Sequence, residues 1–154
     1  MTVWPSDYSQ AWTLKHPVER RGVALHSGAS TVVRLQAAAK PGYWVGWLDQ
    51  PSLALVQLHP DQVADTQLCT ALRLDAQRLA TVELLLAALA GTGVTQAEIL
   101  VDGEEIPLLD GSARPWVEAI GEAQLAPLQT APSPLTLEAP ITLQQGSSFA
   151  TALP

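Results

Sequence analysis

The chain has 154 residues, long enough for one domain with a hydrophobic core. Its formal net charge of -7, from 15 acidic and 8 basic residues, leaves no basic stripe that could neutralise a phosphate backbone, so we expect no nucleic-acid partner. The longest apolar stretch, residues 79–94, contains Glu83 and is shorter than the roughly 20 apolar residues of a membrane span, so we expect no span.

Two further features of the sequence predict a cytoplasmic protein. The N-terminus has no basic region followed by an apolar run, so it does not resemble a secretory signal. The single cysteine, Cys69, excludes an internal disulfide and fits a reducing compartment. We therefore expect a protein of the cytoplasm.

The first half of the chain is predicted to be mostly sheet. Short runs of β-branched and aromatic residues lie between proline and glycine residues, a pattern that suits strands. The expected strands are residues 12–14, 23–25, 31–35, 43–48, 53–58 and 67–74. The last run alternates in a way that buries one of its faces.

A helix is predicted from Thr81, its expected N-cap, to about Ala90, with Gly91 and Gly93 as its stop signals. Apolar side chains surround nearly the whole circumference of this helix, so more than one neighbouring layer must cover it. The strand expected at residues 97–103 fits a helix that packs back on a sheet.

A second helix is predicted at about residues 113–123. The turn Asp110-Gly111-Ser112 leads into it, with Ser112 as the expected N-cap. Pro115 falls in the first helical turn, where the missing N–H does little harm.

We expect the chain to divide into a domain and a tail. The predicted parts are the domain at residues 1–125, a Pro-rich linker at 126–140 and a tail at 141–154, which begins with a strand at 141–146.

Three segments carry a resemblance to a known family, and they are Gly22-Val23-Ala24-Leu25-His26-Ser27-Gly28, the helix at residues 80–91, and Glu105-Ile106-Pro107-Leu108-Leu109-Asp110-Gly111-Ser112. Together they resemble, from about Leu14 to Leu125, the first domain of the zinc-dependent UDP-3-O-acyl-N-acetylglucosamine deacetylases of lipid A biosynthesis (LpxC). The resemblance implies an α+β fold, a two-layer α/β sandwich in which one mostly antiparallel sheet carries two helices. In the family a second domain of similar build follows, and residues 141–154 resemble only its first strand.

The resemblance also implies that the zinc site has been lost. The family's ligands are a histidine directly after the helix glutamate, and a histidine and an aspartate from a His-Lys-x-x-Asp helix of the second domain. This chain has Leu84 after Glu83 and lacks the other two ligands. Its three histidines and Cys69 show none of the close spacings typical of zinc sites. We therefore expect no metal and no cofactor.

Two residues match catalytic or near-catalytic positions of the family. Glu83 matches the general base, which in the family acts on a zinc-bound water and has nothing to activate without the metal. His26 matches a histidine near the family's site, but a structural role in its Gly-flanked turn has at least an equal claim. We assign neither residue a confident catalytic role.

Leucine in place of a zinc ligand favours dry contact, so we expect another layer to cover the helix. The candidate interface residues are Leu84, Leu85, Ala88 and Trp116, although core packing is the stronger interpretation for Trp116. The occupant is a second copy of the chain, a different protein, or the chain's own tail.

Three hypotheses follow for the function. The first is a non-catalytic relative of the deacetylases that serves as a protein-interaction or assembly subunit through its apolar helix layer. The alternative is one half of a split deacetylase whose second domain is a separate polypeptide. The third is a truncated gene product.

Overall fold

The computed structural model describes residues 4–131 and 136–154 of the chain. The strands of the main sheet are β1 (Trp12–Leu14), β2 (Val18–Val23), β3 (Ser30–Gln36), β4 (Gly42–Trp47), β5 (Val56–Gln57), β9 (Gln96–Val101) and β10 (Leu125–Pro127). A smaller sheet contains β6 (Val63–Asp65), β7 (Ala71–Leu74) and β8 (Gln77–Ala80), and a short 3-10 helix, η1 (Pro60–Gln62), precedes it. The helices are α1 (Glu83–Gly91) and α2 (Arg114–Ala123), and the tail forms a hairpin of β11 (Ile141–Gln145) and β12 (Ser148–Ala152).

Strand β9 is the central strand of the main sheet. It pairs antiparallel with β3, which pairs antiparallel with β2, and it runs parallel to β4, which pairs antiparallel with β5. Strand β1 meets the start of β9 in parallel, where Thr13 lies opposite Gln96, and pairs antiparallel with β10. The sheet is therefore mostly antiparallel, as the family resemblance implies.

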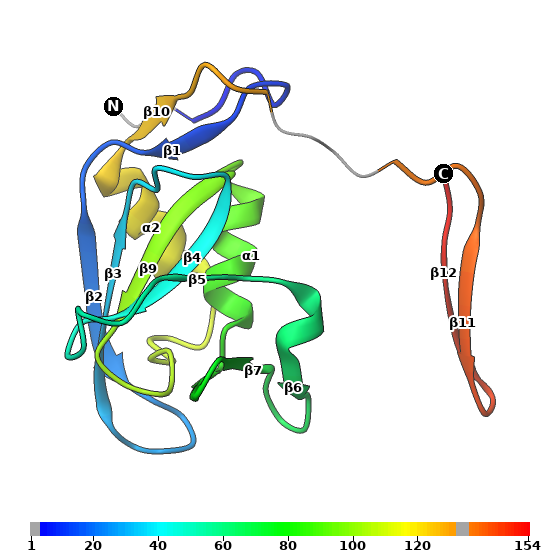
Figure 1. Ribbon diagram of the computed structural model, residues 1–154, viewed down its shortest axis with the longest axis horizontal. Coiled ribbons are helices and arrows are strands. Elements are labelled where there is room, and N and C mark those ends of the chain that lie inside the picture. Colours follow the sequence, from blue (N-terminus) through cyan, green and yellow to red (C-terminus); the bar gives the residue numbers. More distant parts are fainter. Residues whose placement is uncertain (1–3, 132–135) are drawn as a thin grey trace.

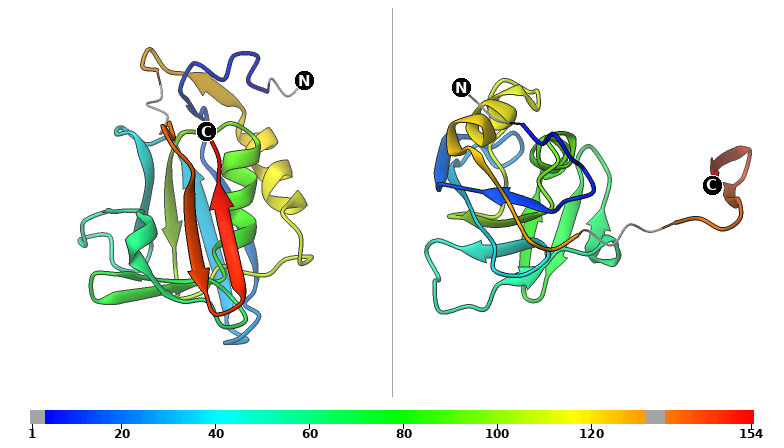
Figure 2. Two further views of the ribbon diagram at one scale, coloured as in Figure 1. Left: turned by 90° about the vertical axis from the view of Figure 1, so that its right-hand side faces the viewer. Right: turned by 90° about the horizontal axis from the view of Figure 1, so that it is seen from above.

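Both helices lie on the same face of the main sheet (Figure 1), and the view in Figure 2 shows the helix layer beside the sheet. The core between the two layers includes Val33, Leu35, Ile99 and Val101 from the strands and Leu85, Leu89, Trp116 and Ile120 from the helices. In the strands these residues are two positions apart, and in each helix they are four positions apart. Such spacings place side chains on one face of a strand or helix, so these residues can meet between the two layers. The predicted α+β fold, with one sheet that carries two helices, is confirmed.

The expected helix caps are wrong. Helix α1 begins at Glu83, and its N-cap is Val82, which makes no side-chain cap hydrogen bond. Thr81 instead has a φ of 58° and uses its hydroxyl to bind Glu105. Helix α2 begins at Arg114 with Ala113 as its N-cap, while Pro115 lies in the first turn as predicted.

Several strands differ from those expected. The strand predicted at residues 23–25 is found earlier in the sequence, as β2, which ends at Val23. Ala24 begins the loop that connects β2 to β3. The runs at 53–58 and 67–74 shorten to β5 and β7, and the second is interrupted by Leu68 at a φ of 68°. Strands β6, β8, β10 and β12 were not predicted.

The region after α2 also differs in part from the predicted linker. Strand β10 pairs with β1, and Ala11 continues the contact through hydrogen bonds with Leu128 and Thr130, so these linker residues belong to the main sheet. The predicted linker also includes residues 132–135, which lie outside the described residues. The strand expected in the tail is present as β11, and all residues of its hairpin are exposed. No helix in the described part of the chain is long and apolar enough to cross a membrane.

Candidate functional site

A buried carboxylate, that of Glu105, joins three segments at the beginning of α1. Only 4% of Glu105 is exposed. Its side-chain oxygens accept hydrogen bonds from the backbone N–H groups of His26 and Ser27, both at 2.9 Å, and from the hydroxyl of Thr81 at 3.0 Å. The loop after β2, the residue after β8 and the segment after β9 therefore meet at one side chain.

These hydrogen bonds decide the charge of Glu105. Burial by itself would raise the pKa of this carboxyl, because it disfavours the charged form. The hydrogen bonds from His26, Ser27 and Thr81 outweigh burial and lower the pKa to about 2. Glu105 is therefore a carboxylate at neutral pH, and its charge is stabilised by the donors around it.

Thr81 has a strained backbone where the chain passes from β8 to α1. Its φ of 58° lies in the left-handed region, which β-branched residues rarely adopt. The side chain is buried, and its hydroxyl donates to Glu105. Such strain persists only where the surroundings determine the conformation, and here Glu105 is one of the groups that hold it. The kink fixes the direction in which α1 leaves the small sheet.

The side chain of Glu83, in the first turn of α1, is held by the segment that leads into β7. Its Oε1 accepts a hydrogen bond from the backbone N–H of Thr70. Glu83 is half-buried, and a negative charge at a helix N-terminus is favourable. In this arrangement Glu83 fixes α1 to the small sheet.

The residues at this end of α1 do not fit a catalytic zinc ion, which ordinarily takes three protein ligands and a water. Leu84, the residue after Glu83, has no donor atom. His26 is exposed, and the group that it contributes to the Glu105 cluster is its backbone N–H. Among residues 4–131 and 136–154, no group of three or more His, Cys, Asp or Glu side chains could hold a metal ion.

The turn Asp110-Gly111-Ser112 is held by its own side chains. One carboxylate oxygen of Asp110 accepts hydrogen bonds from the backbone N–H of Ser112 at 2.9 Å and from its hydroxyl at 2.8 Å. These bonds lower the pKa of Asp110. Gly111 has a φ of 79°, which suits glycine, and Ser112 accepts a bond from the N–H of Arg114. These bonds close the turn that precedes α2.

A glycine of the first motif allows the Glu105 segment to pack on β2. A Cβ atom at Gly22 would lie 2.9 Å from Cδ2 of Leu109 and 3.0 Å from Cβ of Pro107. Real Cβ atoms essentially never come within 3.0 Å of another heavy atom, so a side chain here would force the Leu109 side chain to shift. The backbone of Val23 also accepts a hydrogen bond from the N–H of Leu108.

The candidate interface residues lie at different depths. Leu84 is half-buried, but Leu85 and Ala88 are each only 1% exposed and belong to the core cluster. Trp116 is fully buried, and its indole N–H has no hydrogen-bond partner among the described residues. Leu85, Ala88 and Trp116 belong to the core of the domain. This corrects the assignment of Leu85 and Ala88 to an interface, whereas core packing is the interpretation already favoured for Trp116.

The accessible side of α1 is apolar. Leu84 and Leu86 are half-buried there, and Ala87 and Ala90 are exposed. We call these four residues the α1 face. An apolar pocket of about 310 Å³ adjoins it, where Leu86 and Ala90 meet Leu58, Val63 and Leu72. The α1 face and this pocket form one apolar surface between the helix and the small sheet.

Sequence reasoning missed Glu105 as the centre of the cluster. The available signal was an acidic residue directly before Ile106 and Pro107, in a segment that otherwise becomes apolar. The strain at Thr81 and the bond from Thr70 to Glu83 have no comparable signal, because both depend on contacts between segments distant in the sequence.

The sequence matches one family over nearly its whole length. The sequence profile of the family described as UDP-3-O-acyl N-acetylglycosamine deacetylase (LpxC) matches residues 11–154. The UDP-3-O-acyl-N-acetylglucosamine deacetylase of Trichormus variabilis is 40% identical over 145 residues, which cover 92% of this chain and 52% of the relative. The enzymes of the same name from Thermosynechococcus vestitus and Vibrio cholerae are 40% and 39% identical, each over 144 residues and 92% of this chain, covering 50% and 47% of the relatives. The chain spans about half the length of the curated relatives it matches.

Proposed function

Because this chain belongs to the UDP-3-O-acyl-N-acetylglucosamine deacetylase (LpxC) family, we propose that it is a non-catalytic member that serves as an assembly subunit through the α1 face. The observation that carries the proposal is Leu84. The resemblance places a zinc-ligating histidine at this position, and a leucine side chain cannot bind a metal ion. The protein would act in the cytoplasm and would need no zinc.

The state of Glu83 supports a loss of catalysis. A general base must be positioned against the proton that it removes, and in the family that proton belongs to a zinc-bound water. Here one oxygen of Glu83 accepts the N–H of Thr70, and the next residue is Leu84. The carboxylate has a structural partner and no metal ligand beside it in the sequence.

The composition of the α1 face supports a protein partner. Leu84 and Leu86 remain partly accessible, and the apolar pocket continues from Leu86 to Val63. Burial of apolar surface contributes about 25 cal/mol per Å², so a partner that covers this area would stabilise the assembly. Contiguous apolar surface of this kind marks interaction sites in soluble proteins. The partner is another protein chain or a second copy.

The test is metal analysis, a deacetylase assay and an assembly mass on the purified full chain. We expect no bound zinc, no turnover of UDP-3-O-acyl-N-acetylglucosamine, and a mass above that of the monomer, alone or with its partner. Stoichiometric zinc together with turnover would overturn the proposal. A strictly monomeric chain that binds no protein in its own cells would remove the assembly role.

One observation favours a second candidate, half of a split deacetylase of lipid A biosynthesis. Glu83 is retained at the start of α1, and the strained Thr81 and buried Glu105 still hold that start in place. A separate polypeptide would then supply the second domain and its ligands.

The substitution Leu84→His discriminates this candidate from the first. If one missing ligand separates the chain from activity, Leu84→His mixed with a second-domain polypeptide should bind zinc and deacetylate the substrate. Leu84→Asn, which also adds a polar group but is a poor zinc ligand, is the matched control. Failure of Leu84→His to bind zinc in the mixture would reject the split enzyme.

A further inference from the structure

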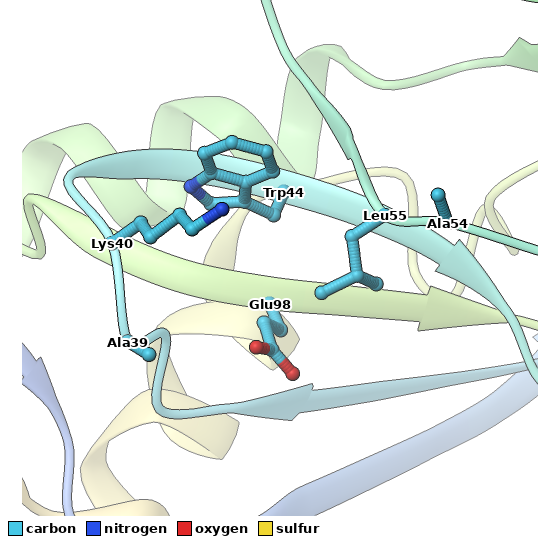
Figure 3. A pocket seen from close by; sticks show the side chains of 6 residues that line it. All are labelled: Ala39, Lys40, Trp44, Ala54, Leu55 and Glu98. Atoms are coloured by element: carbon cyan, nitrogen blue, oxygen red, sulfur yellow. The ribbon is translucent and has the colours of Figure 1, made fainter.

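A second pocket lies on the face of the main sheet that points away from the helices. It has a volume of about 360 Å³ and is lined by Ala39, Lys40, Trp44, Ala54, Leu55 and Glu98 (Figure 3). Trp44 comes from β4 and Glu98 from β9, and these two residues lie opposite each other in the parallel pair. The pocket is separate from the α1 face, because no residue of α1 lines it.

Trp44 presents a fixed aromatic surface to this pocket. Its indole N–H donates to the backbone carbonyl of Pro41 at 3.0 Å, which fixes the orientation of the ring. The Nζ atom of Lys40 lies 5.2 Å from the ring centroid. Figure 3 shows the Lys40 side chain extending along the Trp44 ring. A cation within about 6 Å of an indole face is attracted by the negative potential of the ring. The geometry for binding a cation is thus already present, and a tethered ammonium occupies it.

Glu98 adds a negative charge to the same pocket. One of its oxygens accepts a hydrogen bond from the side-chain amide of Gln36 at 2.8 Å. In the described part of the chain, the ion pairs are Arg20–Glu122, Arg34–Glu19 and Arg114–Glu118, so Glu98 has no cationic partner there. A half-buried carboxylate and an indole ring that line the same pocket suit a positively charged ligand.

We infer that this pocket binds a small organic cation, with an ammonium or quaternary ammonium group against Trp44 and Glu98. Lys40 occupies the indole face when no ligand is present and gives way when one binds. Ala54 and Leu55 line the pocket with carbon and contact the apolar part of the ligand. The net charge of -7 favours the approach of a cation over that of an anion.

The test is a titration of the full chain with tetramethylammonium chloride, in which NMR monitors the chemical shift of the Trp44 indole N–H. The Trp44→Phe variant identifies this signal, because the signal is missing from its spectrum. Sodium chloride at equal ionic strength and uncharged tert-butanol are the control solutes. We expect a saturable shift with tetramethylammonium and with neither control. The absence of a saturable shift, or the same shift with tert-butanol, would overturn the inference.

Two substitutions must act in opposite directions. Lys40→Met removes the competing ammonium, so binding should tighten by about two- to fivefold, as for a cation–π contact at an exposed site. Lys15→Met, which removes the other lysine of the chain, is its control and should have no such effect. Glu98→Gln should weaken binding by at least about as much, while Glu104→Gln, an exposed control, should not. If both lysine variants bound tetramethylammonium more tightly, or both glutamate variants lost affinity equally, the affinity would depend on net charge alone. Either result would reject the site.

Discussion

The two helices are alike on the side that faces the sheet and different on the side that faces away. Leu85 of α1 and Trp116 of α2 are both almost completely buried in the shared core. The exposed residues of α2 are charged and include Arg114 and Glu118, whereas the accessible residues of α1 are apolar apart from Glu83. A helix with one apolar stripe is complete on the surface of a domain, but a helix that is apolar all round needs a second cover.

The outer side of α2 is also tied to the rest of the domain by ion pairs. Arg114 pairs with Glu118 within the helix, and Glu122 pairs with Arg20 of β2, each at 2.8 Å. The α1 face has no comparable polar contacts, because its side chains are leucine and alanine. We conclude that a partner, if it binds the helix layer, binds over α1 rather than α2.

The largest expected effect tests the likeness of the two buried sides. Trp116→Ala and Leu85→Ala should each destabilise the domain by about 2–5 kcal/mol, because each leaves a cavity in the core. Urea denaturation measures both losses. Trp116→Phe should cost less than Trp116→Ala, since it keeps most of the volume and removes an N–H without a partner. A small effect of Leu85→Ala would show that the inner side of α1 is less well packed than that of α2.

The next effect concerns the start of α1, which depends on Glu105. The folded-state pKa of about 2 lies below the ordinary value of 4.5, so the carboxylate contributes stability that is fully present above pH 4.5. This contribution, about 2–3 kcal/mol, is lost as the pH falls from about 5 towards 2. Glu105→Gln should remove this part of the pH dependence in denaturation experiments between pH 2 and 7. Glu118→Gln on α2 is the control, and an equal change in that variant would refute the assignment to Glu105.

The difference between the outer sides is tested by a charge on each helix. Ala87→Glu places a carboxylate on the α1 face at an exposed position, so the domain should stay folded. The assembly should weaken at least about tenfold, because the charge would be buried in the interface. The control is Glu118→Lys, which changes the charge at an exposed position of α2. Sedimentation measures the assembly mass of both variants. Dissociation by Glu118→Lys but not by Ala87→Glu would show that the interface does not lie on the α1 face.

The smallest effect is expected for the exposed pair on α2. Arg114→Ala breaks the ion pair with Glu118, but both side chains are largely exposed and water screens their attraction. Thermal unfolding should therefore show no measurable change in Tm. A clear decrease in Tm would mean that the Arg114–Glu118 ion pair stabilises the domain and does more than keep the outer side of α2 hydrated.

The helices were predictable from the sequence because they depend on local patterns, whereas the two-layer arrangement followed from the family resemblance. The apolar composition of α1 and the turn before α2 placed both helices to within a few residues. The depth of Leu85 and Ala88 was not predictable in the same way, since a helix that is apolar all round does not reveal which side faces the sheet. Only the position of the sheet relative to α1 decides this.

The polar centre of the candidate site was harder to predict for a related reason. The buried carboxylate of Glu105 is stabilised by hydrogen bonds from His26 and Thr81, which are distant from it in the sequence. The left-handed conformation of Thr81 runs against the preference of a β-branched residue, so propensity predicted a cap instead. Local rules therefore fail at this junction because tertiary contacts override them.

Zinc binding and assembly through the α1 face can be measured together. Native mass spectrometry of the full chain from its own cells, beside the Ala87→Glu variant, reads bound metal and assembly mass together. We predict a zinc-free complex, with a second copy or another protein, that Ala87→Glu dissociates. A complex that holds stoichiometric zinc, or a zinc-free complex that Ala87→Glu leaves intact, would contradict the account.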